Sequence, residues 1–330
     1  MTTIKDVARA AGVSVATVSR VHNGSPLVTE ATRRRVRKVA TRLGYSPHAA
    51  ARSLSSKKTN VIGVLLPDLY GEFYSELIRG VDQCAQERGF HLLVASSHNE
   101  RAEIAAAVQS MRGRVDGLIV MSPAPGAHRP VKDLPATFPV LLLGAAGTGF
   151  DSITIANEAG AREMVQHLIA KGHRRIAMIL GPKENQDAAE RFEGYRQALA
   201  AAGIDEDAAL QVTGDFTDTS GYDAARTILN STPRATAIFA GNDAMAVGAL
   251  GALRAAGIRI PEDMAVAGFD DIPMSRYTHP PLTTVRVDIS GLGQRAAVRL
   301  FEAVANHRRH RARREVVPGQ LIIRASTDSP

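Results

Sequence analysis

The stretch that decides the fold of the start of the chain is TIKDVARAAGVSVATVSRVHNG, from Thr3 to Gly24. Small apolar residues recur at helical spacing after Thr3, a residue type that commonly caps helices, and Gly12 then interrupts the pattern. Ser14 is a natural N-cap for a second short helix, from Val15 to about Val21. Two short helices joined by a tight glycine turn are the pattern of a helix-turn-helix motif.

The second predicted helix has one face suited to DNA. In a helix-turn-helix motif this helix enters the major groove, so its exposed residues must be able to approach base edges. Val18 and Val21 are expected to face the core. The remaining positions are polar or small, namely Val15, Ala16, Thr17, Ser19 and Arg20.

A third helix is predicted after Thr29, with Gly44 ending it. Its core stripe, spaced i, i+3, i+4 and i+7, consists of Val36, Val39, Ala40 and Leu43. Taken alone this segment would be an ordinary amphipathic surface helix. Joined to the preceding motif, it predicts a three-helix DNA-binding head over residues 1–45.

Residues 46–60 are predicted to form a hinge helix and linker. Ser46 can cap a helix and Pro47 suits its first position. About eight residues are too few for a helix to be stable alone in water, so this one is expected to form only against a partner. The run Ser55 to Lys58 reads as linker.

Charge is distributed unevenly along the chain. Residues 1–60 contain twelve Lys and Arg against Asp6 and Glu30, a net charge of +10, whereas the whole chain has +7 and the remaining 270 residues therefore sum to −3. Clustered Lys and Arg are the means by which proteins bind phosphates, so the basic head favours a polyanion partner. On charge alone, a solvated basic face remains the alternative.

The Thr3 to Gly24 stretch, followed by GYSPHAAARSL from Gly44 to Leu54, resembles the N-terminal signature of the LacI/GalR (lactose repressor) family of bacterial transcription regulators. The resemblance implies that Val15, Ala16 and Arg20 read bases, with Arg20 on a guanine. It also implies that Leu54 is wedged into the centre of a palindromic operator beside its mate from a second subunit. The complete set of expected DNA contacts is Val15, Ala16, Thr17, Arg20, Asn23, Tyr45, His48, Ala51 and Leu54. Two positions depart from the family pattern: His22 stands where an aliphatic residue is common, and His48 where Asn is frequent.

The body, residues 61–330, is predicted to be an α/β structure of two lobes. Short apolar runs of the kind that form buried parallel strands alternate with amphipathic helices, first in VIGVLLP, HLLVA, GLIVM and VLLLG, and again in RIAMIL, TAIFA and MAVAGFD. Helices are expected over about 73–88, 104–111, 191–202 and 244–255. The pattern predicts a periplasmic-binding-protein-like body with doubly wound parallel sheets, and a ligand site between the lobes at the carboxyl ends of the strands.

Several residues with hydroxyl-binding chemistry follow the predicted strands. They are Asp68, Arg191, Asn242, Asp243, Asp270 and Asp271. Each alone would be an ordinary cap or surface group, but together they provide the carboxylates, amides and forked guanidinium that bind paired sugar hydroxyls. Phe73 and Phe216 could cover the C–H face of a sugar ring.

The family resemblance extends to these segments, because GNDAMAVGAL, GFDD, ERFEGY and GDFTDTSGY look like its effector-pocket segments. The resemblance implies effector contacts at Phe73, Arg191, Phe216, Asn242 and Asp270. Gly71-Glu72 replaces a common Asn-Pro, and Ala156 stands where Asp is frequent.

Other classes of protein are disfavoured. One cysteine, Cys84, and the absence of any Cys/His metal spacing argue against disulfides and metal, and no cofactor is expected. No export signal or run of 18 apolar residues is present, so we expect a cytoplasmic protein without a membrane partner. The sequence lacks a Walker A run, G-x-S-x-G and H-E-x-x-H, which argues against an enzyme.

The sequence thus predicts a sequence-specific DNA-binding transcription regulator, a repressor of carbohydrate uptake or catabolic genes controlled by a sugar effector. Its expected partners are a palindromic double-stranded operator, the effector and a second copy of the chain. A homodimer is expected because the C-terminal residues lack leucine heptads. The alternatives are a regulator that answers to a non-sugar metabolite or a protein co-regulator, and a solute-binding protein. Within the regulator class, activation rather than repression stays open, because the sign depends on the position of the operator.

Overall fold

The computed structural model describes residues 2–22, 25–45, 58–98, 100–122, 126, 129–135, 137–145, 149–306 and 310–328. The chain divides into two compact units, Met1–Thr59 and Asn60–Pro330. The predicted hinge helix lies outside the described residues, and of the whole hinge and linker segment, 46–60, only 58–60 are described.

The described part of the first unit contains three helices, α1 (Ile4–Ala11), α2 (Val15–His22) and α3 (Glu30–Arg42). The predicted caps are present. Asp6 accepts hydrogen bonds from the backbone and hydroxyl of Thr3, and the Ser14 hydroxyl accepts from the backbone N–H of Thr17 at 3.1 Å. Gly12 has φ of +63°, a left-handed conformation that glycine adopts without strain and that turns the chain from α1 into α2.

The head has its own apolar core, built from one face of each helix. Its buried members are Val7, Ala8, Ala11, Val18, Val21, Val28, Val36, Val39 and Ala40. Val18 and Val21 of α2 are therefore turned inward, as the helical spacing predicts. The opposite face of α2 remains available to a partner.

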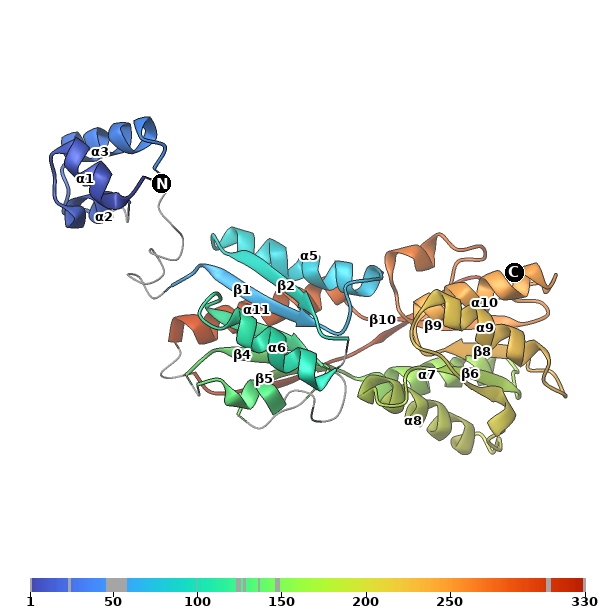
Figure 1. The fold of residues 1–330 in the computed structure, drawn as a ribbon. Coiled ribbons are helices and arrows are strands. Elements are labelled where there is room, and N and C mark those ends of the chain that lie inside the picture. Colours follow the sequence, from blue (N-terminus) through green and yellow to red (C-terminus); the bar gives the residue numbers. More distant parts are fainter. Residues whose placement is uncertain are drawn as a thin grey trace. The chain divides into compact units, whose positions relative to one another are not determined.

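The second unit consists of two α/β lobes, each with a six-stranded sheet (Figure 1). The first sheet has the order β11-β5-β4-β3-β1-β2 and contains β1 (Val61–Leu66), β2 (His91–Ser96), β3 (Gly117–Met121), β4 (Val140–Leu143), β5 (Asp151–Ile155) and β11 (Arg314–Val317). The second has the order β12-β10-β9-β8-β6-β7 and contains β6 (Ile176–Leu180), β7 (Gln211–Thr213), β8 (Ala237–Ala240), β9 (Ala265–Asp270), β10 (Thr283–Arg286) and β12 (Gln320–Ile322). Within the described residues, every strand pairing is parallel except that of β10 with β12.

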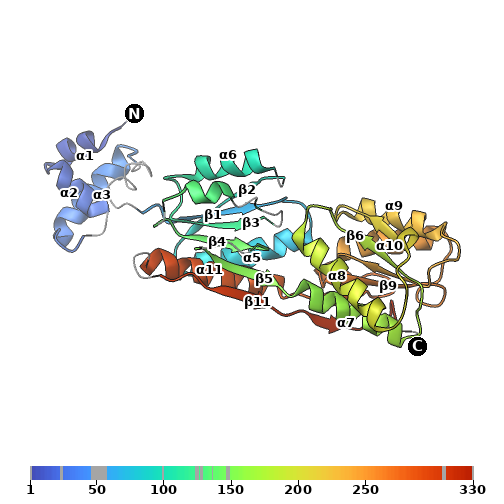
Figure 2. The same cartoon turned by 90° about the horizontal axis from the view of Figure 1, so that it is seen from below.

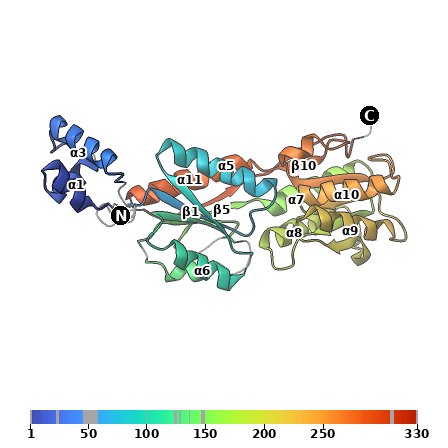
Figure 3. The same ribbon diagram turned by 45° about the horizontal axis from the view of Figure 1, so that its top comes forward.

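Helices cover both faces of each sheet. In the first lobe, α5 (Glu72–Glu87) and α11 (Ile289–Asn306) lie on one face and α6 (Arg101–Met111) on the other (Figure 3). In the second lobe, α7 (Asn157–Ala170) and α8 (Gln186–Ala201) lie on one face and α9 (Asp218–Leu229) and α10 (Asp243–Ala255) on the other. Short 3₁₀ turns are η1 (Arg129–Asp133), η2 (Ala208–Leu210) and η3 (Pro273–Arg276).

The alternation of the strands explains this layering. In β1, Ile62, Val64 and Leu66 belong to the core beneath α5 and α11, whereas Leu65 belongs to the core beneath α6. Because successive side chains of a strand point to opposite faces, a strand covered on both sides must be apolar throughout. The continuous apolar runs in the sequence therefore correspond to doubly covered strands.

The chain passes between the lobes three times, after β5, between β10 and α11, and between β11 and β12 (Figure 2). Two predicted helix starts differ from the structure, and α6 begins at Arg101 rather than near Ile104. Helix α8 begins at Gln186 rather than near Arg191, because Asn185 caps it by accepting a hydrogen bond from the Ala188 N–H at 3.0 Å. Arg191 consequently lies in the second turn of this helix.

Candidate functional site

The exposed face of α2 is the candidate DNA-reading surface of the head. Ala16 and Arg20 are exposed, Val15 is 41% exposed, and Thr17 is half-buried. All four therefore lie clear of the head core. The structure places these predicted base-reading residues on one short helix held from behind by Val18 and Val21.

Tyr45, also predicted to contact DNA, is half-buried at the end of the head. Its ring makes an edge-on contact with the ring of His22, with 5.7 Å between centroids, and its backbone N–H donates to the Ala40 carbonyl at 2.9 Å. His22 thus packs against an aromatic ring where the family commonly has an aliphatic side chain. The other predicted contacts, Asn23, His48, Ala51 and Leu54, lie outside the described residues.

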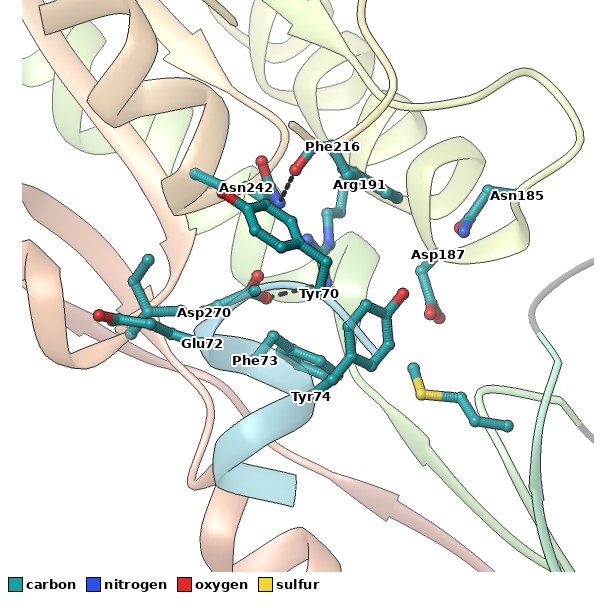
Figure 4. Close-up of a pocket in the computed structure, with 14 residues that line it drawn as sticks. Tyr70, Glu72, Phe73, Tyr74, Asn185, Asp187, Arg191, Phe216, Asn242 and Asp270 are labelled. Carbon is teal, nitrogen blue, oxygen red and sulfur yellow. Dashed lines mark hydrogen bonds and ion pairs between the residues drawn. The ribbon is translucent and has the colours of Figure 1, made fainter. Parts of the chain in front are cut away.

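The second candidate site is a cavity between the lobes of the body, with a volume of about 100 Å³ (Figure 4). One water needs about 10–15 Å³, so the cavity admits a ligand of several heavy atoms. The structure brings the five predicted effector residues together around it. The complete lining is Tyr70, Gly71, Glu72, Phe73, Tyr74, Met121, Asn185, Asp187, Arg191, Phe216, Asn242, Ala244, Asp270 and Ile272.

Arg191 is the centre of the polar wall of the cavity. Its side chain is almost fully buried and donates to Asn157 Oδ1 at 2.9 Å and to the Gly241 carbonyl at 2.6 Å. It forms an ion pair with Asp270 at 3.2 Å. The guanidinium also lies 3.9 Å from the centroid of the Phe269 ring, a cation–π arrangement. These contacts fix the guanidinium in one position.

Asp270 presents a carboxylate whose hydrogen-bonding capacity is not fully used. Its Oδ1 is buried and, among the described residues, pairs with Arg191 but has no hydrogen bond of good geometry. Burial raises the pKa of Asp270 to about 6, against the opposing charge of Arg191. Its backbone φ of +117° is strained for a residue with a side chain. Such strain at a cavity-lining residue is typical of functional sites.

Three other acids that follow predicted strands, Asp243, Asp271 and Asp68, do not line the cavity. Asp243 accepts from the Ile272 N–H at 3.0 Å and from the hydroxyls of Ser275 and Thr284 at 2.5 Å each, and burial raises its pKa to about 8. Asp271 pairs with Arg286, Arg324 and Arg276. Asp68 caps its own loop by accepting from the backbone N–H groups of Leu69 and Tyr70. These three acids are therefore structural.

Asn242 is both a cap and a cavity residue. Its Oδ1 accepts from the Met245 N–H at 3.0 Å at the start of α10, and its Nδ2 donates to the Phe216 carbonyl at 3.1 Å. Phe216 has φ of +72° and its ring edge faces Gly181, where an added Cβ would lie 2.4 Å from Phe216 Cζ. Asn242 thus holds the backbone of Phe216, whose side chain lines the cavity.

Sequence reasoning missed the remaining polar and aromatic groups. Asp187 is buried in the first turn of α8, and burial raises its pKa although Asn157 Nδ2 donates to it at 2.8 Å. Tyr74 has its pKa raised by burial, and Tyr70 is 74% exposed at the edge of the cavity. The cap signal at Asn185 could have revealed Asp187, but the aromatics follow a loop whose course the sequence pattern does not show.

The fold and these two sites define a class of protein: a regulator with a helix-turn-helix head and a two-lobed small-molecule-binding body. Comparison with known proteins agrees. Residues 3–48 match the family model described as bacterial regulatory proteins, lacI family, and residues 165–327 match the periplasmic binding protein-like domain. No helix within the described residues meets the length and apolarity needed to span a membrane.

Full-length relatives give the family. The ribose operon repressor of Escherichia coli K12 is 38% identical over 324 residues, covering 96% of this chain and 98% of the relative. A structure of the lac repressor dimer bound to operator and an anti-inducer is 30% identical with a TM-score of 0.86, covering 99% of each chain. The CelR regulator in complex with cellobiose is 34% identical with a TM-score of 0.73, covering 99% of this chain and 100% of that one. The chain belongs to the LacI family. It is a DNA-binding transcription regulator rather than an enzyme.

Proposed function

We propose that this regulator is a cytoplasmic homodimeric repressor of carbohydrate genes, and that a sugar bound in the Arg191–Asp270 cavity controls its binding to a palindromic operator. The observation that carries the proposal is the pair itself. A buried, rigid fork of donors beside a buried carboxylate with free acceptor capacity is the chemistry that binds adjacent hydroxyls.

The aromatic side chains support a sugar rather than an ion. Phe73 and Phe216 come from opposite lobes, and Tyr70 and Tyr74 add rings from the first lobe, as Figure 4 shows. Apolar faces combined with a few fixed polar groups are typical of small-molecule sites. The relatives point the same way, since one is a ribose operon repressor and another binds cellobiose.

In the head, we propose that Val15, Ala16, Thr17 and Arg20 read the operator and that the predicted hinge, with Leu54 as its wedge, couples the sugar site to DNA. A hinge helix of about eight residues is marginally stable. A ligand that contributes about 1–3 kcal/mol of coupling is therefore enough to shift the equilibrium between the folded and unfolded hinge helix.

The test is a titration of the purified full-length protein with pentoses, hexoses and disaccharides, followed by calorimetry. A sugar at about 100 times its dissociation constant should stabilise the folded state by about 2.7 kcal/mol. We expect Asp270→Asn to reduce this stabilisation, and the bound sugar to change operator affinity. If no sugar binds while a nucleobase or amino acid does, the sugar proposal is wrong.

A further inference from the structure

Glu72 bridges the two lobes at the rim of the cavity. It is the first residue of α5 in the first lobe, and its Oε2 accepts a hydrogen bond of 2.8 Å from the backbone N–H of Met274 in η3 of the second lobe. Figure 4 shows its carboxylate directed away from the rings of Phe73 and Tyr74. We propose that Glu72 is a positioning residue that latches the lobes together and slows release of the effector, an inference that rests on the proposed function of the cavity.

The lobe-1 end of this bridge is rigid. Helix α5 packs on α11 with almost no side chain between the two backbones: a Cβ added at Gly80 would lie 2.0 Å from the Ser290 carbonyl oxygen, and one at Gly293 would lie 2.3 Å from the Leu77 carbonyl oxygen. A helix seated this closely on its neighbour cannot tilt freely. The carboxylate of Glu72 is therefore held by the lobe and not by a mobile loop.

The lobe-2 end is equally well fixed. The Asp243 carboxylate holds the two residues on either side of the η3 start, through the Ile272 N–H and the Ser275 hydroxyl. Ser275 and Asp243 are fully buried. The Met274 N–H lies between these anchors, so its position relative to the second sheet is set by the core.

The chemistry of the Met274 N–H explains why Glu72 matters. Met274 is the second residue of η3, and the first N–H groups of a helical turn have no partner within that turn. Glu72 supplies the missing acceptor from the other lobe. The hydrogen bond can exist only in a lobe arrangement like this one, so separating the lobes would exchange it for water.

The hydrogen bond between Glu72 and Met274 also lies close in sequence to Asp270, the proposed effector contact. The segment from Asp270 to Met274 carries the ligand-facing carboxylate at one end and the latch donor at the other. A ligand bound to Asp270 and the hydrogen bond to Glu72 would therefore both restrain the same five-residue segment. Loss of the latch should speed effector release without removing any group from the polar wall around Arg191.

The primary test needs no ligand. Spin labels at Ala106→Cys in α6 and Ala201→Cys in α8, both exposed, report the lobe separation in the full-length protein, and native Cys84 is buried. We expect Glu72→Ala to shift or broaden the interlobe distance distribution of the ligand-free protein. Glu72→Gln, which retains an acceptor oxygen, should stay close to wild type. Asp82→Asn, which removes an exposed carboxylate farther along the same helix, should have no effect.

The second readout is the dissociation rate of whichever sugar the titration identifies. We expect Glu72→Ala to raise it about 3–10-fold, the effect of losing one ordinary hydrogen bond at an exposed position, and Glu72→Gln to restore most of the difference. An unchanged distance distribution in Glu72→Ala overturns the latch. So does a Glu72→Gln protein that is as altered as Glu72→Ala, because the effect would then come from charge at the start of α5. Failure of every sugar to bind would count against the proposed function and leave the distance result to decide the latch.

Discussion

The guanidinium of Arg191 lies 3.2 Å from the carboxylate of Asp270, and both side chains are only 5% exposed. Removing two charges from water is costly, and their attraction offsets this only when geometry and further hydrogen bonds are good. Arg191 has those further bonds, to Asn157 and Gly241, whereas Asp270 Oδ1 has none among the described residues. The pair is thus asymmetric: the guanidinium has two further hydrogen bonds to the protein, and the carboxylate Oδ1 can still accept hydrogen bonds.

The asymmetry predicts that effector affinity depends on pH. Burial raises the pKa of Asp270 to about 6, so the carboxylate is neutral below that pH and ionised above it. The ionised form accepts hydroxyl hydrogen bonds more strongly. Affinity should be about tenfold lower at pH 5 than at pH 7.5, following the ionised fraction. Calorimetry across this range should show the change in wild type, and a flat profile in Asp270→Asn.

Removing the cation should destabilise the second lobe. Arg191→Met leaves Asp270 buried without its counter-charge, which typically costs about 3–5 kcal/mol when the partner is ionised. Because Asp270 is neutral below its pKa, denaturation at pH 8 should show a larger loss than denaturation at pH 5. The double variant Arg191→Met/Asp270→Asn should recover the part of the lost stability that differs between pH 8 and pH 5. Equal losses at both pH values would mean that the hydrogen bonds of Arg191, and not its charge, carry the effect.

Much of this architecture is visible in the sequence because buried strands and helix caps leave strong local signals. The runs around β1, β3, β6, β8 and β9 are apolar throughout, since helices cover both faces of each sheet. The five predicted cavity residues converge because the carboxyl ends of parallel strands meet at one edge. Helix α9 and strands β11 and β12 left no comparable signal. The two strands are three or four residues long, and exposed residues break their apolar pattern.

The site was less predictable than the fold. Asp187 and Asn157 meet only because α7 and α8 pack against each other, a contact between positions thirty residues apart. The distinct roles of Asp270 and Asp271 likewise depend on backbone conformation: φ values of +117° and +56° send one carboxylate into the cavity and the other toward three arginines. Sequence spacing cannot encode that choice.

A matched pair of glycines in α10 tests how closely the helices of the second lobe approach. A Cβ added at Gly248 would lie 1.9 Å from the Asp218 carbonyl oxygen of α9, so Gly248→Ala should cost at least about 1–3 kcal/mol of stability. At Gly251 the nearest atom is 3.7 Å away, and alanine there should stabilise the helix by about 0.5–1 kcal/mol. Chemical denaturation of both variants should give opposite signs. Two losses of similar size would contradict the close approach of α9 and α10.

A second matched pair separates base reading from general attraction to DNA. Arg20 and Arg42 are both exposed cations of the head, but Arg20 lies on α2 and Arg42 at the end of α3. Arg20→Ala should cost about 1–3 kcal/mol on the operator and little on unrelated DNA, because a bidentate contact to one base is lost. Arg42→Ala should weaken binding to both DNAs alike and reduce the salt dependence. Binding measured on the two DNAs at several salt concentrations distinguishes these outcomes. If Arg20→Ala weakened both DNAs equally, α2 would contact phosphates at that position, and the operator would be read by its other exposed residues.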